Sequence, residues 1–341
     1  MKNLLAALLL IPTIISAQET LNLTLDHDGI TRDYTLYVPA SYDSETAVPL
    51  VFSLHGYTSN NALNMMYTGF NLIADTANFI VAYPQGTAYL GANHWNVGAF
   101  TAGSTTDDVG FLSELIDEIS ANYNINLDRV YSTGMSNGGY MSFLLACQIS
   151  EKIAAIASVT GSMTPPTYDE CNPQHPTPVL QIHGTADPVV AYDGTAGWSE
   201  PIPDVLDYWI TFNNCDASAS ISSIPDIDTS DGTTVDHLVW SSGDNGVTTE
   251  HFKVYGGLHD WPGAFGNMDI NASEEVWKFF MRFDINGALN SSIEETTFNS
   301  HDRTLEKIVD VLGREVEETE GQILFYIYSD GTTEKRFIST F

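Results

Sequence analysis

The chain has 341 residues and a formal net charge of −32, from 44 acidic and 12 basic side chains. This length is enough for one large domain, or for one domain with an accessory piece. The negative charge repels phosphate backbones and therefore excludes nucleic-acid binding as a function. Such a balance is typical of a protein that stays soluble outside the cell.

The first 17 residues have the pattern of a secretory signal peptide. Lys2 precedes an apolar run over residues 4–15, which ends at Ser16-Ala17 before the polar Gln18-Glu19. A charged start, a short apolar stretch and a small residue before a polar one are the features of such a signal. No stretch of the chain is long and apolar enough for a stable membrane anchor. We therefore expect an exported soluble protein, secreted or held at the cell surface.

The next part of the chain alternates predicted strands and helices. Apolar and polar side chains alternate on both sides of Asp28-Gly29, which predicts a β-hairpin over residues 21–38. Continuous apolar runs predict strands buried on both faces, at residues 49–54, 79–83, 129–133, 153–159, 179–182 and 251–255. Helical spacing of apolar residues predicts helices at 108–119, 204–212 and 273–283, the last capped by Ser273. The fold class is therefore α/β, with a mostly parallel sheet that helices cover on both faces.

The composition changes near the C-terminus. Residues 287–300 are polar and lack periodicity, which predicts a linker, and five of the 12 basic residues follow it. Residues 305–315 and 323–328 resemble short strands with turns. The predicted organisation is a signal peptide (1–17), a catalytic α/β domain (18–286), a linker (287–300) and an appended β-rich segment (301–341). The alternative is a final hairpin that completes the main domain.

A G-x-S-x-G sequence identifies a candidate nucleophile. Gly134-Met135-Ser136-Asn137-Gly138 lies between a predicted buried strand and a helical pattern. In that context the motif forms a sharp turn that lifts the serine hydroxyl out at the carboxyl edge of the sheet. Taken alone, the same motif also fits an ordinary glycine-rich turn.

Two later residues could activate that serine. A serine nucleophile needs a base, and the base needs an orienting acid, which follow the serine in that order in this kind of fold. Asp187 and His259 each follow the end of a predicted strand, in loops with no regular structure. This ordered set is much less expected by chance than a single loop histidine. His183, at a strand end, is interpreted as a packing or loop-bracing residue.

The remaining candidate site residues would surround the serine. The backbone N–H groups of Asn137 and Tyr57 are expected to stabilise the oxyanion, one after the nucleophile and one after an early strand. Aromatic side chains in loops could contact substrate, namely Tyr57, Trp95, Trp198 and Trp261, although about half of such tryptophans serve packing instead.

The cysteines and acidic clusters do not predict a metal or a cofactor. Cys147 and Cys171 are the expected disulfide pair, with Cys215 as a buried free thiol. No Cys/His spacing resembles a zinc site. Asp107-Asp108 precede a predicted helix and are interpreted as capping residues. The acidic loop 226–231 could bind calcium but lacks the spacing of an EF-hand.

Seven motifs occur in order between Leu21 and Phe283: LHGY at 54–57, YPQG at 83–86, WN at 95–96, DDVGF at 107–111, GMSNGGYM at 134–141, HGTADP at 183–188 and GLHDWPG at 257–263. In this combination the chain resembles the polyhydroxybutyrate depolymerase, feruloyl esterase and acetylxylan esterase group of α/β-hydrolases, the carbohydrate esterase family 1 type. The resemblance implies the triad Ser136, Asp187 and His259, and an oxyanion hole at Asn137 and Tyr57.

The C-terminal segment is similar to a type IX secretion sorting segment, through VDVLGRE at 309–315 and DGT at 330–332. That resemblance implies secretion machinery as a partner, with cleavage or attachment of the segment at the cell surface.

The sequence thus predicts an exported serine ester hydrolase that forms an acyl-enzyme without a cofactor. Its ester substrate could be polymeric: a polyhydroxyalkanoate, or feruloyl or acetyl esters on xylan. Small esters or an aromatic polyester are the alternative. A peptidase of the prolyl oligopeptidase type would need a gating domain for which the chain has no room, and an inactive binding module would be expected to lack a triad member.

Overall fold

The computed structural model describes residues 18–289, 305–309, 316, 323–328 and 333–337. The predicted signal peptide and residues 290–300 of the predicted linker lie outside the described residues. The chain divides into two compact units, and the boundary in the sequence falls between Leu289 and Asn290. Each unit is described by itself.

The first unit is built on a ten-stranded sheet with the strand order β1-β2-β4-β3-β7-β8-β9-β12-β11-β10. Neighbouring strands from β4 to β12 in this order are parallel, and antiparallel pairs complete both edges. The predicted mostly parallel α/β fold is confirmed. The strands are β1 Glu19–His27, β2 Ile30–Val38, β3 Val48–Leu54, β4 Ile80–Pro84, β7 Ile125–Met135, β8 Ala155–Val159, β9 Val179–Gly184, β10 Ser220–Ser223, β11 Thr234–Trp240 and β12 Thr249–Tyr255.

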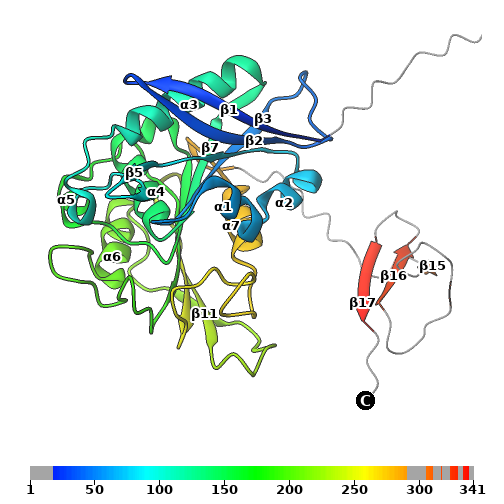
Figure 1. The fold of residues 1–341 in the computed structure, drawn as a ribbon. Helices are drawn as coiled ribbons and strands as arrows, with labels where there is room; N and C mark the ends of the chain where they lie inside the picture. Colours follow the sequence, from blue (N-terminus) through cyan, green and yellow to red (C-terminus); the bar gives the residue numbers. More distant parts are fainter. Residues whose placement is uncertain (1–17, 290–304, 310–315, 317–322, 329–332, 338–341) are drawn as a thin grey trace, which may run out of the picture. The chain divides into compact units, whose positions relative to one another are not determined.

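Helices cover both faces of this sheet (Figure 1). The helices are α1 Asn61–Thr68, α2 Phe70–Ala77, α3 Asp108–Asn122, α4 Asn137–Gln148, α5 Pro165–Glu170, α6 Ile202–Phe212 and α7 Ala272–Phe280. Side chains of α3, α4 and α6 pack in one core cluster with Phe52 of β3, whereas α2 and α7 pack in another with Val51. Because successive strand residues point to opposite faces, a strand between two helix layers is apolar throughout.

Short elements complete the first unit. They are the hairpin strands β5 Thr87–Tyr89 and β6 Ala92–His94, the pair β13 Phe283–Asp284 and β14 Gly287–Ala288, and the 3₁₀ turns η1 Ala99–Thr101, η2 Ser150–Lys152 and η3 Asp244–Gly246. Residues 287–289 of the predicted linker thus belong to this unit.

Two predicted helix starts differ in detail from the structure. The cap of α7 is Asn271, whose side chain accepts hydrogen bonds from the amides of Ser273 and Glu274, so the assignment of Ser273 as cap was wrong. Asp107 caps α3 as predicted. Asp108 is instead buried and pairs with Arg32 at 2.6 Å, which explains a buried carboxylate at this position.

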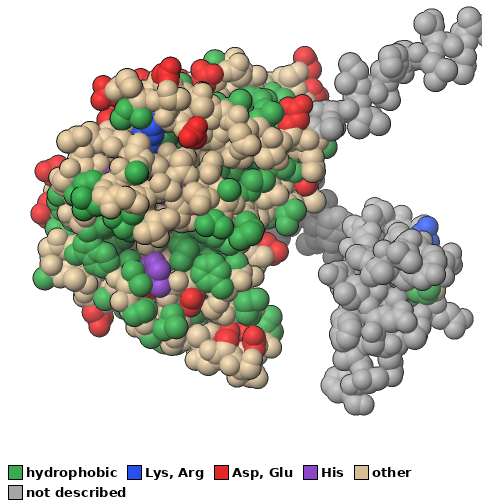
Figure 2. Space-filling view, viewed as in Figure 1, with side chains coloured by type: hydrophobic (Ala, Val, Ile, Leu, Met, Phe, Trp, Pro, Cys, Tyr) green, Lys and Arg blue, Asp and Glu red, His purple; other side chains and the backbone are tan. Residues whose placement is uncertain are grey.

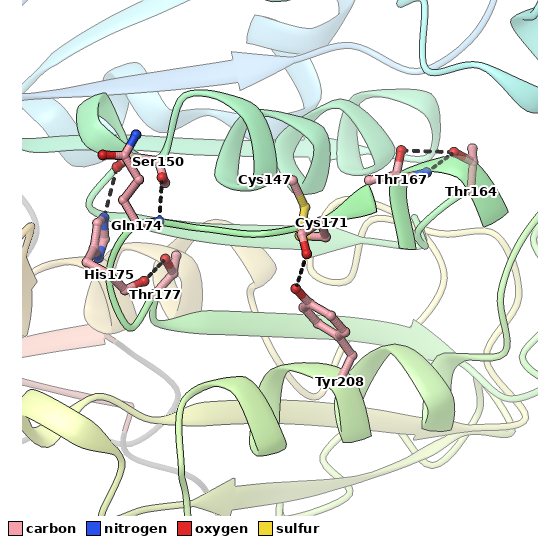
Figure 3. The surroundings of a disulfide bond; sticks show 9 residues. All are labelled: Cys147, Ser150, Thr164, Thr167, Cys171, Gln174, His175, Thr177 and Tyr208. Carbon is pink, nitrogen blue, oxygen red and sulfur yellow. Dashed lines mark hydrogen bonds between the residues drawn. A yellow bond between two sulfur atoms is a disulfide. The ribbon is translucent and has the colours of Figure 1, made fainter. Parts of the chain in front are cut away.

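A disulfide joins Cys147 near the end of α4 to Cys171, the residue after α5, as Figure 3 shows. This is the pair expected from the sequence. Around it, the amide of Gln174 donates to Ser150, and the hydroxyl of Tyr208 on α6 donates to the carbonyl of Cys171 at 2.8 Å. The disulfide therefore joins α4 to the end of α5, and the hydrogen bond from Tyr208 connects α6 to the same point. Cys215 is a free, partly buried thiol.

The second unit is an antiparallel sheet in the order β15-β16-β17, with β15 Leu305–Val309, β16 Ile323–Tyr328 and β17 Thr333–Phe337. β15 and β16 fall within the segments predicted to form strands. Across the described residues of both units, no helix is long and apolar enough to cross a bilayer.

Candidate active site

Ser136 lies in a strained turn between β7 and α4. Its φ of 53° and ψ of −119° are unusual for a residue with a side chain. The amide of Ser136 donates to the carbonyl of Val159 at 2.8 Å, which holds the turn in place. A Cβ at Gly138 would lie 2.2 Å from the carbonyl oxygen of Leu54, so the helix can pass the neighbouring strand only with glycine there. The local geometry explains the small residues of the motif.

Asp187 follows β9, and its carboxylate is fully buried. One carboxylate oxygen accepts the amides of Val189 and Val190, at 2.8 and 2.9 Å. The other accepts Nδ1–H of His259 at 2.8 Å. Burial raises the pKa of Asp187, but these hydrogen bonds outweigh it, so the net pKa lies below its ordinary value. The carboxylate is therefore held ionised beside the imidazole.

His259 lies in the loop after β12, and 19% of its side chain is exposed. Strand β12 is the parallel neighbour of β9, so the loops that carry His259 and Asp187 leave the same edge of the sheet. The register of β7, β8 and β9 places Met135, just before Ser136, in line with Ile182. Ser136 makes no side-chain hydrogen bond within residues 18–289; in free enzymes, the bond from a nucleophile to its base often tightens only when substrate binds.

The loop after β3 lies beside the nucleophile. A Cβ built on Gly56 would be 3.5 Å from the Cβ of Ser136. The ring of His55 donates from Nδ1 to the carbonyl of Gly56 at 2.8 Å and accepts the amide of Gly86 at Nε2. Burial lowers the pKa of His55 to about 4, so the ring is neutral. Because a trans peptide directs its C=O and N–H to opposite sides, the N–H of Tyr57 faces away from His55.

Asn137 contributes a second free amide, since the first residues of a helix have no intrahelical acceptor for their N–H groups. Its side chain is occupied elsewhere. Oδ1 accepts the amide of Trp95 at 2.7 Å, and Nδ2 donates to the carbonyl of Trp95 at 3.0 Å. This two-bond clamp leaves only the backbone N–H of Asn137 for a ligand.

Two of the four predicted substrate contacts are wrong. The side chain of Trp95 is 0% exposed, and its Nε1–H donates to the carbonyl of His55 at 2.9 Å. Trp261 is 1% exposed and donates to the hydroxyl of Ser273. Neither indole can reach a ligand in solvent, because each packs in the protein interior.

The other two aromatic candidates remain accessible. Tyr57 is 38% exposed. Trp198 is partly buried and packs edge-on against Phe100, which in turn packs edge-on against Tyr140, four residues after the nucleophile. Figure 2 shows a surface histidine flanked by hydrophobic side chains, with acidic side chains mostly toward the margins of the same face.

Two buried side chains brace the loops of the site: the role of Trp95 was missed from the sequence, and that of His183 was expected. Trp95 connects the loop at His55 to the clamp at Asn137, and its only sequence signal was the short WN motif. His183 is fully buried, as its interpretation as a bracing residue predicted, and donates from Nε2 to the carbonyl of Val190. Burial lowers the pKa of His183 to about 4, so it braces the loop of Asp187 as a neutral ring.

Acidic side chains in loop 226–231 bond to their own turns. Asp228 accepts from Ser230, and Asp231 accepts from Thr233. Within the part of the chain that the structure describes, no cluster of three or more His, Cys, Asp or Glu residues could hold a metal ion.

The chain is similar to known esterases in sequence and in structure. Residues 32–196 match the family model described as esterase PHB depolymerase. The acetyl xylan esterase from Aspergillus awamori has a similar structure, with a TM-score of 0.56 and 14% identity, over 77% of this chain and 99% of that one. The chain has an α/β-hydrolase fold. The fold expected from the sequence motifs is therefore confirmed.

Relatives in sequence are esterases. The bifunctional acetylxylan esterase/xylanase XynS20E of Neocallimastix patriciarum is 28% identical over 275 residues, which are 80% of this chain but 36% of that protein. The probable feruloyl esterase C of Aspergillus niger is 26% identical over 262 residues, 73% of this chain and 84% of that one. The chain thus shares sequence with proteins named as acetylxylan and feruloyl esterases, and it spans about a third of the length of the first of them.

Proposed function

We propose that the chain hydrolyses carboxylic esters through an acyl-enzyme formed on Ser136, with His259 as base and Asp187 as the acid that orients it. The observation that carries this proposal is the 2.8 Å hydrogen bond between His259 Nδ1 and a buried, ionised Asp187, in loops at the same sheet edge as the strained turn of Ser136. That bond fixes the tautomer of His259, which leaves Nε2 free to accept a proton.

In the proposed reaction, His259 takes the hydroxyl proton as Ser136 Oγ attacks the ester carbonyl carbon. The backbone N–H groups of Tyr57 and Asn137 donate hydrogen bonds to the tetrahedral oxyanion. Each such donor lowers the free-energy barrier by about 3 kcal/mol. The alkoxide then leaves with the proton from His259, and an acyl-enzyme remains. Water, deprotonated by His259, attacks this ester, and the acid product leaves as Ser136 regains its proton.

The proposed substrates are acyl esters on a polysaccharide, feruloyl or acetyl groups on xylan. Support comes from the relatives, whose printed names are those of acetylxylan and feruloyl esterases. The matched family model, named for polyhydroxybutyrate depolymerase, supports a polyester as the second candidate. Both substrates need the same chemistry at Ser136 and differ only in the acyl and alcohol groups.

A panel of esters tests the proposal: methyl ferulate, acetylated xylan, polyhydroxybutyrate film and p-nitrophenyl esters of increasing chain length. Wild type and Ser136→Ala are compared, with Ser142→Ala, a buried serine of α4, as the matched control. We expect Ser136→Ala alone to lose hydrolysis of every ester. Equal rates for Ser136→Ala and wild type would refute the mechanism, and activity confined to polyhydroxybutyrate would refute the polysaccharide assignment.

We also propose that residues 1–17 direct export and that residues 301–341 act as a sorting segment at the cell surface. The support is the sequence pattern of each segment, together with the separation of residues 290–341 as their own unit. Truncation after Asn290 should leave esterase activity in the cell extract and abolish its appearance outside the cell. Normal export of the truncated chain would refute the sorting role, and loss of folding would instead favour a C-terminal part needed by the first unit.

A further inference from the structure

An open groove of about 400 Å³ lies on the surface between α5 and α6. Its lining is Tyr168, Asp207, Tyr208, Thr211 and Phe212. None of these residues belongs to the proposed catalytic site, and the reaction described above does not use them. All three aromatic side chains are only partly buried, so their rings are accessible.

The aromatic rings form a surface rather than a cage. The rings of Tyr208 and Phe212 are parallel within 3°, with centroids 6.1 Å apart. A group held between two ring faces needs a plane separation of about 7 Å, since each van der Waals contact takes about 3.5 Å. A cation therefore cannot be enclosed between these two rings. Tyr168 packs beside Tyr208 at a centroid distance of 5.5 Å and extends the aromatic surface.

The surface is held in place before any ligand arrives. The hydroxyl of Tyr208 donates to the carbonyl of Cys171, and the disulfide to Cys147 anchors that carbonyl (Figure 3). Tyr168 lies on the short helix α5, which ends at the same cysteine. Rings that are already ordered lose little conformational entropy on binding, which favours a ligand that makes only shallow contacts.

Acidic side chains surround the aromatic surface. Asp204, Glu200, Asp207 and Asp169 lie close enough to raise the pKa of Tyr168, in addition to the larger effect of its burial. The groove lining contains no Lys or Arg. Ionised carboxylates accept hydrogen bonds but cannot donate them, so a suitable ligand supplies donors. An anionic polymer would be repelled, and a polyester chain has no donor to offer.

We propose that this groove binds a neutral polysaccharide chain, as a second subsite that holds the polymer apart from the place of ester cleavage. Pyranose rings combine a C–H face, which packs on aromatic rings, with hydroxyl groups that donate to carboxylates. The inference rests on the proposed function only for the choice of xylan as the probe. Its ligand chemistry follows from the rings and the acids of α5 and α6.

Affinity electrophoresis in gels that contain neutral deacetylated xylan tests the subsite. The protein carries Ser136→Ala, and the additional changes are Tyr168→Ala, Phe212→Ala and Asp207→Asn. We expect xylan to retard the Ser136→Ala protein, and Tyr168→Ala or Phe212→Ala to weaken binding about tenfold, as for the loss of one aromatic contact. Tyr255→Ala, an exposed aromatic outside the groove, is the matched control and should bind as before.

Each outcome decides the inference. Absence of retardation, or equal retardation with and without Tyr168, would overturn it. Retention by polylysine or by polyhydroxybutyrate granules in place of xylan would overturn the assignment of a neutral sugar. The midpoint of thermal unfolding confirms that each variant is folded. Hydrolysis of p-nitrophenyl acetate, measured with Ser136 present, reports on the proposed triad separately, so the two proposals can fail independently.

Discussion

Removal of the disulfide should reduce stability without slowing hydrolysis of small esters. The change is Cys147→Ser together with Cys171→Ser. The two cysteines are 24 positions apart in the sequence. For a closed loop of that length, the entropy lost by the unfolded chain corresponds to about 3.5 kcal/mol of stabilisation at 25 °C. In a domain of this size, such a loss lowers the unfolding midpoint by about 10 °C.

The structure also indicates why the rate should persist. Ser136 precedes α4 and Cys147 lies near its far end. With a rise of about 1.5 Å per residue, the two positions are about 16 Å apart along the helix. We therefore expect kcat/KM for p-nitrophenyl acetate within about twofold of wild type at 20 °C, since the perturbation is remote from the reacting groups.

The assay is urea-induced unfolding followed by fluorescence, with the free energy of unfolding extrapolated to water. Cys215→Ser is the matched control, because it removes a partly buried thiol that has no covalent partner; its effect should stay below about 1 kcal/mol. A double variant that loses less than about 1 kcal/mol, or one that loses as much as Cys215→Ser, would refute the loop-entropy reasoning.

Three further predictions concern the site and its buried histidines. Asp187→Asn should lower kcat by about 10³–10⁴-fold with little change in KM, because the amide no longer fixes the tautomer of His259; a loss below tenfold in steady-state kinetics would contradict this. Trp95→Phe removes one hydrogen bond and should lower kcat about tenfold at unchanged KM, and a change confined to KM would contradict a positioning role. Acid should destabilise the fold, because burial lowers the pKa of three histidines, to about 4 for His55 and His183 and about 3 for His251. These three histidines take up protons on unfolding once the pH falls below their unfolded pKa of about 6.5, so the free energy of unfolding should decrease from there down to about pH 4, by up to about 4 kcal/mol per pH unit. In urea titrations, His251→Gln should reduce that slope by about a third, and an unchanged slope would exclude His251 as a contributor.

The sheet and the turn at Ser136 were predictable because their causes are local in the sequence. A strand buried on both faces is apolar throughout, as β3 and β8 are. The glycines around Ser136 are required by contacts within a few ångströms of the turn. The disulfide could be predicted for a simpler reason, since three cysteines allow only a few pairings.

Features set by distant partners were not predictable. Asp108 is identical in type to the cap residue beside it, and only Arg32, far away in the sequence, makes it a buried ion-pair partner. Trp95 and Trp261 lie in loop segments by sequence, yet tertiary packing buries both. At α7, Asn271 and Ser273 are both good caps, and the backbone path decides between them.

Trp95 also explains how the two loops of the proposed oxyanion site keep their relative positions. The proposed donors come from different strands: Tyr57 follows β3, and Asn137 follows β7. An oxyanion hole works only if both N–H groups keep their positions within about 0.5 Å. The backbone of Trp95 makes two hydrogen bonds to the side chain of Asn137, and its indole makes one to the carbonyl of His55. Since one buried residue contacts both loops, a shift of either donor would break a hydrogen bond in the core, and the core thereby preorganises the site.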